Sequence, residues 1–158
     1  MKKTAVFPGS FDPVTRGHEE LIKRALPLFD HIIIGIGVNT QKKHMFSLER
    51  RKKWLEEIFS LEPKITIESY SGLTIDFCNK MNAAYILRGL RSSADFEFER
   101  NIAQMNHAME NKIESIFLVT TPELSAINSS IIRDIIKNKG NVHGFIPDKI
   151  TINEADII

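Results

Sequence analysis

Residues 7–18 read Phe7-Pro8-Gly9-Ser10-Phe11-Asp12-Pro13-Val14-Thr15-Arg16-Gly17-His18. The apolar run 5–7 leads into this segment and predicts a first β-strand, and the amphipathic run after it predicts a first helix. A turn of glycine and proline that ends at a helix start presents free backbone N–H groups and the positive end of a helix dipole. The segment therefore predicts an anion site, where His18 can respond to charge that develops on a phosphate.

The composition predicts a cytoplasmic protein with a single domain over residues 1–158. A chain of 158 residues can bury roughly 70% of its unfolded surface in one domain. The net charge of +1 gives no overall field for nucleic acid, so phosphate binding has to be local and no nucleic-acid partner is expected. A lone cysteine, Cys78, excludes an internal disulfide and a cysteine metal cluster. The sequence contains no signal peptide or membrane-spanning run, which predicts no membrane association.

Apolar, often β-branched runs alternate with helical patterns along the whole chain. Strands are predicted at 5–7, 32–38, 65–67, 85–87 and 116–119. Five helices are predicted. The first covers residues 21–29, with an early end at Pro27, and the second follows a cap at Ser47. The third covers 73–81, the fourth covers about 94–109, and the fifth ends at Lys139-Gly140. This alternation predicts an α/β fold, a doubly wound, Rossmann-like parallel sheet of about five strands with helices on both faces.

Several cationic and hydroxyl side chains follow the ends of the predicted strands. Ligands of such sheets bind at the carboxyl ends of the strands, near the point where the strand order reverses. The residues that this rule selects are His18, Lys42, Arg88, Arg91, Ser129 and Ser130. Together they predict a polyphosphate site at one edge of the sheet.

Each of these residues also has a structural interpretation. His18 could cap its helix, Lys42 could be a solvated loop residue, and the paired serines could cap the last helix. Arg88 and Arg91 could form ion pairs inside the chain. Asp12 is expected to fix the first loop through hydrogen bonds to its own backbone. The candidate acidic partners of the arginines are Asp95, Glu97 and Glu99.

Missing motifs narrow the chemistry further. The sequence has neither a GxxxxGK[ST] phosphate loop nor a GxGxxG fingerprint, so a P-loop ATPase and an ordinary nicotinamide dehydrogenase both fit poorly. No serine, histidine and acid are placed for acyl transfer.

The Met105 and Met109 stripe is expected in the core or at a subunit interface. The histidines expected to be structural or exposed are His31, His44, His107 and His143.

Two segments resemble the signatures of the nucleotidyltransferase superfamily. They are residues 8–13 followed by Gly17-His18, and the stretch 127–133, Ile-Asn-Ser-Ser-Ile-Ile-Arg. Within this superfamily, Lys42-Lys43 and residues 86–91, 94–97 and 99 resemble the bacterial phosphopantetheine adenylyltransferase family. The resemblance runs from residue 3 to about residue 147.

This resemblance implies an activity in coenzyme A synthesis. ATP and 4′-phosphopantetheine would give dephospho-coenzyme A and pyrophosphate by direct in-line attack, without a covalent enzyme intermediate. Mg²⁺ would arrive with ATP, with no protein ligand assigned to it, and the chain would form a homo-oligomer, a hexamer in this family. A related transferase with another phosphate acceptor and a non-catalytic nucleotide-binding module are the alternatives.

The resemblance also implies roles for individual residues. The catalytic residues would be His18, Lys42 and Arg91. Those that bind phosphopantetheine would be Ser10, Lys42, Thr74 and Arg88, with Leu73 beside the pantetheine arm. Those that bind ATP would be Ser10, Phe11, His18, Gly89, Leu90, Arg91, Glu99, Leu124, Ser125, Ala126, Ile127, Asn128, Ser129 and Ser130. Two positions depart from the family pattern. Asn128 stands where the family usually has serine, and Thr74 stands where relatives often have a bulkier apolar residue.

Overall fold

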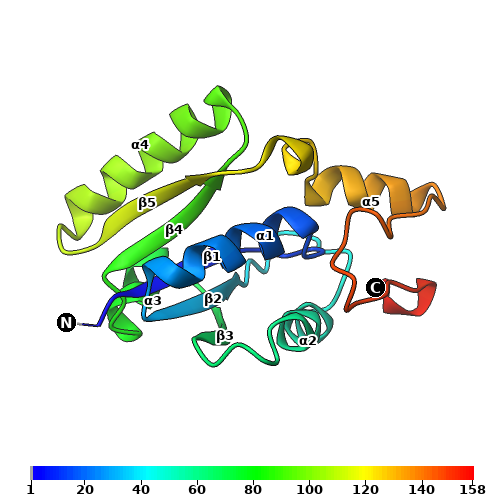
Figure 1. Ribbon diagram of the computed structural model, residues 1–158, viewed down its shortest axis with the longest axis horizontal. Coiled ribbons are helices and arrows are strands. Elements are labelled where there is room, and N and C mark those ends of the chain that lie inside the picture. Colours follow the sequence, from blue (N-terminus) through cyan, green and yellow to red (C-terminus); the bar gives the residue numbers. More distant parts are fainter. Residues whose placement is uncertain (1) are drawn as a thin grey trace.

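The computed structural model describes residues 2–158, whose strands form one five-stranded parallel sheet in the order β3-β2-β1-β4-β5 (Figure 1). The strands are β1 (Thr4–Gly9), β2 (His31–Gly37), β3 (Ile65–Tyr70), β4 (Tyr85–Leu90) and β5 (Glu114–Val119). All five lie where the apolar runs predict them. β4 continues past the predicted end at residue 87, because its register with β5 extends to the pair Leu90 and Val119.

The helices begin and end at residues with clear local causes. They are α1 (Arg16–Ala25), α2 (Leu48–Ile58), α3 (Thr74–Lys80), α4 (Ser93–Met109) and α5 (Ser129–Lys137). Pro27 lies in a short 3₁₀ turn directly after α1, which confirms the predicted early end. The Ser47 hydroxyl accepts a hydrogen bond from the Arg50 N–H at 3.1 Å, which confirms the predicted cap of α2.

The helices cover both faces of the sheet, as the doubly wound pattern predicts. Successive side chains of a strand point to opposite faces, so Ala5 and Phe7 pack in one cluster and Val6 in another. The larger cluster contains buried residues of α1, α2 and α5, and the smaller one those of α3. In Figure 1, α4 runs beside β4 and β5 at one edge of the sheet.

The strand order reverses between β1 and β4, so the site predicted from the strand ends lies at this position. Gly89 of β4 lies so close to α1 that a Cβ atom there would collide with the Leu21 side chain. Glycine therefore allows α1 to pack closely beside the end of β4. This packing brings the start of α1 next to the cationic residues that follow β4.

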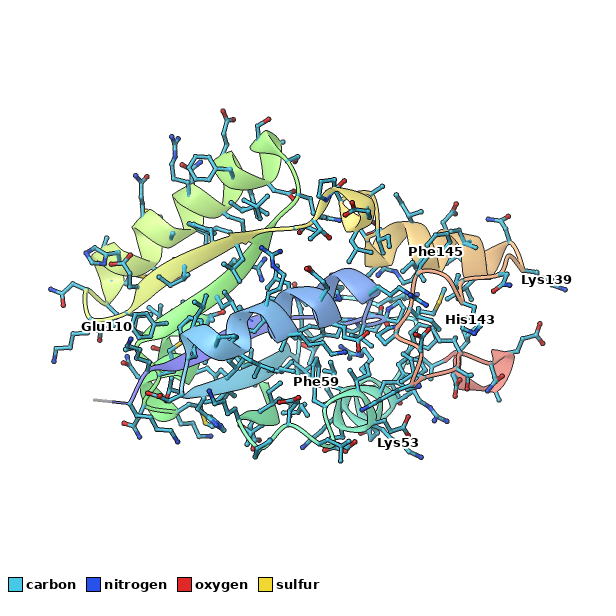
Figure 2. The ribbon with its side chains drawn as sticks, viewed as in Figure 1. Lys53, Phe59, Glu110, Lys139, His143 and Phe145 are labelled. Atoms are coloured by element: carbon cyan, nitrogen blue, oxygen red, sulfur yellow. The ribbon has the colours of Figure 1, made fainter. Side chains whose placement is uncertain are left out.

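Met105 and Met109 of α4 are 63% and 53% exposed, so of the two locations expected for the methionine stripe the core is wrong, and a subunit interface stays a prediction. α5 ends just before Lys139-Gly140, as predicted, and Lys139 (labelled in Figure 2) takes the left-handed conformation, with φ 59°. The Gly140 N–H then donates to the Ile135 carbonyl, which terminates the helix. None of the described helices is long and apolar enough to cross a membrane.

Candidate active site

Two clefts open at the carboxyl edge of the sheet. The first, of about 370 Å³, runs between β3, β4 and α4 and has partly apolar walls that include Tyr70, Ile102 and Phe117. The second, of about 420 Å³, lies between the starts of α1 and α5 and is more polar. The clefts have six lining residues in common: Pro8, Gly9, Ser10, Lys42, Arg88 and Glu99. Two ligands, one in each cleft, would therefore meet beside Ser10, Lys42 and Arg88.

His18 belongs to the capping box of α1, which confirms its structural interpretation, and it also lines the second cleft. Thr15 forms a capping box with His18, in which the Thr15 N–H donates to His18 Nδ1 at 3.0 Å and the His18 N–H donates to the Thr15 hydroxyl at 3.3 Å. Because Nδ1 accepts a hydrogen bond from the backbone N–H, the neutral ring carries its own proton on Nε2. His18 therefore has an N–H group left for a ligand in the cleft.

The surroundings of the imidazole keep it neutral. Phe11 and Phe7 contact the ring edge-on, with ring centroids 5.0 and 6.3 Å from it. Burial, followed by the charges of Arg88 and Arg91, lowers the pKa of His18 from 6.5 to about 4. His18 is therefore neutral near pH 7 in the ligand-free protein, with its N–H on Nε2.

This lowered pKa predicts a pH dependence of stability. The unfolded chain binds a proton at His18 near pH 6.5 and the folded chain only near pH 4, so the free energy of unfolding should fall as the pH drops from 6.5 to 4. Urea unfolding at intervals across this range measures the slope. In His18→Ala the slope should be shallower, and an equal slope in the two proteins would contradict the assigned pKa.

Arg88, near the end of β4, and Arg91, just after it, form the ion pairs that the structural interpretation anticipated. Arg88 binds the Glu99 carboxylate in a bidentate pair, with Nε and Nη2 at 3.0 and 2.6 Å from its oxygens, and donates to the Pro8 carbonyl at 2.7 Å. Arg91 contacts Asp95 through its backbone N–H at 3.0 Å and through Nε at 3.4 Å. Both arginines also line the second cleft, because the carboxylates hold the guanidinium groups without covering them.

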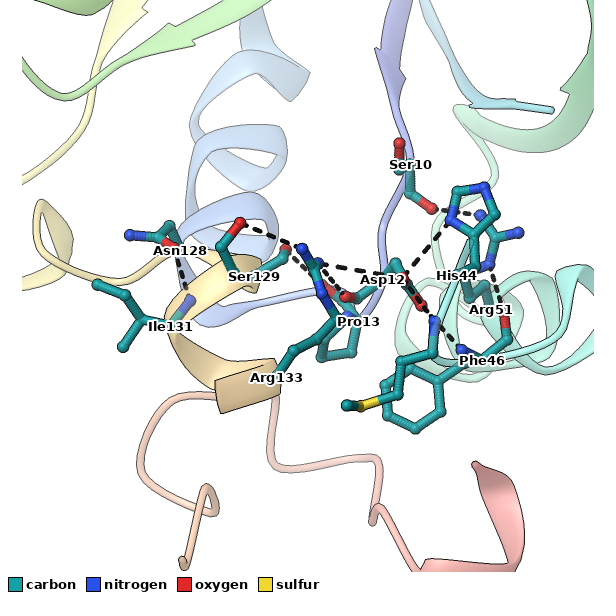
Figure 3. Close-up of polar contacts among 12 residues, drawn as sticks. Ser10, Asp12, Pro13, His44, Phe46, Arg51, Asn128, Ser129, Ile131 and Arg133 are labelled. Carbon is teal, nitrogen blue, oxygen red and sulfur yellow. Dashed lines mark hydrogen bonds and ion pairs between the residues drawn. The ribbon is translucent and has the colours of Figure 1, made fainter. Parts of the chain in front are cut away.

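The start of α5 has a different arrangement from the one its two serines suggest. Asn128 is the N-cap, and its side-chain oxygen accepts from the Ile131 N–H at 2.9 Å. The Ser129 hydroxyl donates to the Pro13 carbonyl at 2.8 Å, which ties α5 to the first loop (Figure 3). The N-terminus of α5 therefore remains open to the second cleft, with Asn128 in the capping position where the family usually has serine.

Asp12 is structural as predicted, but its hydrogen bonds go to a distant segment rather than to its own loop. Its carboxylate is 2% exposed and accepts from the N–H groups of Met45 and Phe46 at 2.9 and 3.0 Å (Figure 3). The fold places the end of β1 beside the segment before α2, a contact that local sequence does not specify. Asp12 thus joins the first loop to the loop that carries Lys42.

Lys42 lies in an exposed loop after β2 and lines both clefts. Among the described residues, no side chain forms a hydrogen bond or ion pair with its ammonium group. Ser10 also lines both clefts, and its carbonyl accepts from Arg51 Nη1 at 2.7 Å. The cation is therefore available to a ligand that bridges the two clefts.

Most of the residues expected at the site line a cleft, and a few do not. The expected residues that line neither cleft are Leu73, Leu90, Ser125 and Ala126. Leu90 is buried in the fold, and the Ser125 hydroxyl donates to the Pro122 carbonyl at 2.8 Å. Lining residues to which the sequence assigned no role include Tyr70, Asn106, Thr120 and Arg133. Arg133 lies in the signature-like stretch 127–133 and Thr120 directly follows the predicted strand 116–119, whereas Tyr70 and Asn106 carry no comparable signal.

The described residues provide no ready-made set of metal-binding side chains. No group of three or more histidine, cysteine, aspartate or glutamate side chains among them is placed to hold a metal. The carboxylates that line the second cleft are already engaged: Glu99 with Arg88, Asp95 with Arg91, and Asp12 with two backbone N–H groups. A metal ion in this cleft would therefore be held mainly by oxygens of the ligand and water.

Comparison with known proteins agrees with this geometry. A family model described as cytidylyltransferase-like matches residues 6–135. The chain is 54% identical to a phosphopantetheine adenylyltransferase of Flavobacterium psychrophilum, over 95% of this chain and 99% of that protein. It is 52% identical to the enzyme of that name from Flavobacterium johnsoniae, over 96% of this chain and 99% of that protein.

The fold has a solved counterpart as well. A structure from Vibrio parahaemolyticus, described as a nicotinate-nucleotide adenylyltransferase, superposes with a TM-score of 0.70 at 16% identity, over 94% of this chain and 90% of that one. At this identity the likeness concerns the fold alone. The similarity to the two Flavobacterium proteins is more specific, because more than half of the residues are identical over nearly the full length of the chain. The same chain has two clefts that meet at cationic residues. The chain belongs to the phosphopantetheine adenylyltransferase family of cytidylyltransferase-like proteins.

Proposed function

We propose that this chain transfers the adenylyl group of ATP to 4′-phosphopantetheine, which gives dephospho-coenzyme A and pyrophosphate. The observation that carries the proposal is the junction of the two clefts at Ser10, Lys42 and Arg88. The partly apolar first cleft suits the pantetheine arm, and the polar second cleft, with the starts of two helices, suits the nucleotide and its phosphates.

The reaction is a single displacement at phosphorus. An oxygen of the phosphopantetheine phosphate attacks the α-phosphorus of ATP, and the bond from that phosphorus to the β-bridging oxygen breaks. Pyrophosphate leaves with the bonding electron pair. The attacking phosphate is largely ionised at neutral pH, because its second pKa is near 6, so the step needs no general base. Catalysis then consists of positioning the two anions and stabilising their charge.

The polar residues at the junction and in the second cleft would each have a role in this step. His18 Nε2–H would donate to an α-phosphate oxygen, where negative charge grows in the transition state. Lys42 would lie between the incoming phosphate and the α-phosphate and reduce their repulsion. Arg88 would bind the phosphopantetheine phosphate, and Arg91 would hold the departing pyrophosphate. The backbone N–H groups at the start of α5 would bind the β- and γ-phosphates.

Mg²⁺ would enter as part of the substrate, bound to the ATP phosphates and water. The ion would supply charge neutralisation on those phosphates when bound. The chain's own contribution is cationic and comes from the junction residues. We assign no side chain of this chain as a ligand of Mg²⁺.

The proposal also includes self-association. Large apolar side chains are exposed along α4 and the end of β5: Phe96, Phe98, Ile102, Met105, Met109 and Val119. Such a patch favours a contact with another subunit over exposure to water. A hexamer is the expected assembly, and sedimentation velocity of the purified protein measures it.

The activity is tested with purified protein, MgATP and 4′-phosphopantetheine, with dephospho-coenzyme A and pyrophosphate measured separately. Nicotinate mononucleotide and glycerol 3-phosphate replace the acceptor in parallel reactions, and pantetheine without its phosphate is the negative control. Product should form with phosphopantetheine and at most weakly with the others. Absence of product despite ATP binding would refute the proposal, and a preference for nicotinate mononucleotide would favour the related transferase.

A further inference from the structure

The backbone that follows the Lys42 loop is held by three separate segments of the chain. Met45 and Phe46 lie between this loop and α2, and both are buried. Their N–H groups donate to Asp12, and Arg51 Nε donates to the Phe46 carbonyl at 3.1 Å (Figure 3). The remaining group, the Met45 carbonyl, accepts from the Ile158 N–H at 3.0 Å. All four backbone polar groups of Met45 and Phe46 therefore have partners, and the last partner belongs to the C-terminal segment.

The C-terminal segment, residues 153–158, is itself anchored beside α2 (Figure 1). Asp156 forms an ion pair with Arg50 at 2.8 Å, and its carboxylate is only 5% exposed. Its second oxygen accepts from the Asn153 N–H at 2.8 Å, and Ile157 pairs with Phe46 in an antiparallel bridge. The matched family model ends at residue 135, so this segment lies outside the part of the chain that the family description covers.

Arg51 connects this region to the reaction centre. It is 3% exposed, and besides the Phe46 carbonyl it donates through Nη1 to the Ser10 carbonyl at 2.7 Å. Ser10 and Lys42 both line the two clefts. A shift of Met45 and Phe46 would therefore move the end of the Lys42 loop relative to Ser10, where the two ligands would meet.

We infer that residues 153–158 are a positioning segment for Lys42. The segment satisfies the Met45 carbonyl and pairs with Phe46, and so fixes the point from which the exposed loop extends to the clefts. Lys42 has a long flexible side chain and, among the described residues, no partner of its own, so its average position depends on this backbone support. The inference rests on the proposed function, because only adenylyl transfer gives Lys42 two phosphates to bind.

Two pairs of variants isolate the contacts of the segment. Ile158→Pro removes the N–H that bonds to Met45, and Ile157, at φ −78° and ψ 133°, already has a conformation that a following proline tolerates. Ile158→Ala keeps the N–H and alters only a side chain that is 77% exposed. Asp156→Asn weakens the pair with Arg50, and Glu154→Gln makes the same charge change at an exposed residue of the segment.

The first measurement is trypsin cleavage after Lys42 or Lys43, identified by the mass of the fragments, and it does not depend on activity. Cleavage should be about fivefold faster in the combined variant Asp156→Asn with Ile158→Pro, because a looser loop reaches the protease more often. The controls Ile158→Ala and Glu154→Gln should cleave at the rate of the unmodified protein. Equal rates in all variants would overturn the inference, even if adenylyl transfer itself were absent.

The second measurement is a double-mutant cycle with Lys42→Ala, using kcat for adenylyl transfer. The combined variant should lose about tenfold in kcat when Lys42 is present, since small displacements of a catalytic group have large effects. In the Lys42→Ala background the same two changes should alter kcat by less than about twofold. An equal loss in both backgrounds would show that the segment only stabilises the fold, and would overturn the positioning role. Thermal unfolding of each variant confirms that the folded protein is being compared.

Discussion

His18→Ala is expected to lower kcat for adenylyl transfer by about 10²- to 10³-fold, the usual effect of removing one hydrogen-bond donor to transition-state charge. The Kd for ATP should change by less than about threefold, because Nε2–H interacts most strongly when charge grows on the α-phosphate. Stopped-flow or quench kinetics give kcat, and equilibrium titration gives Kd.

The capping role of His18 requires a separate check on stability. Loss of Nδ1 removes one half of the capping box with Thr15, which should cost about 1 kcal/mol of unfolding free energy. This cost is too small to account for the expected loss of rate in a protein that remains folded. His107→Ala, at an exposed histidine in the last turn of α4, serves as the control and should leave kcat unchanged. A large loss of ATP affinity in His18→Ala would instead assign the imidazole to ground-state binding.

Lys42→Ala is expected to lower kcat/KM by about 10²-fold for both substrates, because the ammonium group would compensate charge on both phosphates at once. Stability should change by less than about 0.5 kcal/mol, since the side chain is exposed and packs against no core residue. Initial rates with each substrate varied, together with thermal unfolding, test both statements.

The neighbouring Lys43 provides a matched control for this variant. Lys43 is also exposed and carries the same charge in the same loop, but it lines neither cleft. Lys43→Ala should therefore retain kcat/KM within about twofold, the range usual for a surface change far from the ligands. Similar losses in both variants would mean that the loop acts through its overall charge. A Lys42→Ala protein with nearly full activity would remove Lys42 from the mechanism.

The fold could be predicted from local pattern because its cause is local. Apolar periodicity in β1 and α1, the Ser47 cap and the break at Pro27 all act within a few residues, and each appears in the structure as predicted. The alternation of strands and helices then restricts the sheet to a doubly wound form. For the Met105 and Met109 stripe the pattern left the core and a subunit interface open, since an apolar pattern does not distinguish the core from an exposed face, and the structure excludes the core.

The identity of the polar groups at the site was also available from the sequence. Residues after the ends of parallel strands meet at one edge, so His18, Lys42, Arg88 and Arg91 could be grouped without coordinates. Their partners could not be assigned uniquely. The sequence offered three acids for two arginines, and the structure pairs Glu99 with Arg88 and Asp95 with Arg91.

The sequence by itself determined the sheet, the Ser47 cap of α2 and which polar residues gather at the ends of the strands. Only the tertiary structure decided that Asp12 binds Met45 and Phe46, that Arg51 joins Phe46 to Ser10, and that the Ile158 N–H completes the Met45 backbone. Local propensities act over a few residues, whereas these hydrogen bonds join segments brought together by strand order and loop path. The position of Lys42 is therefore a property of the whole fold.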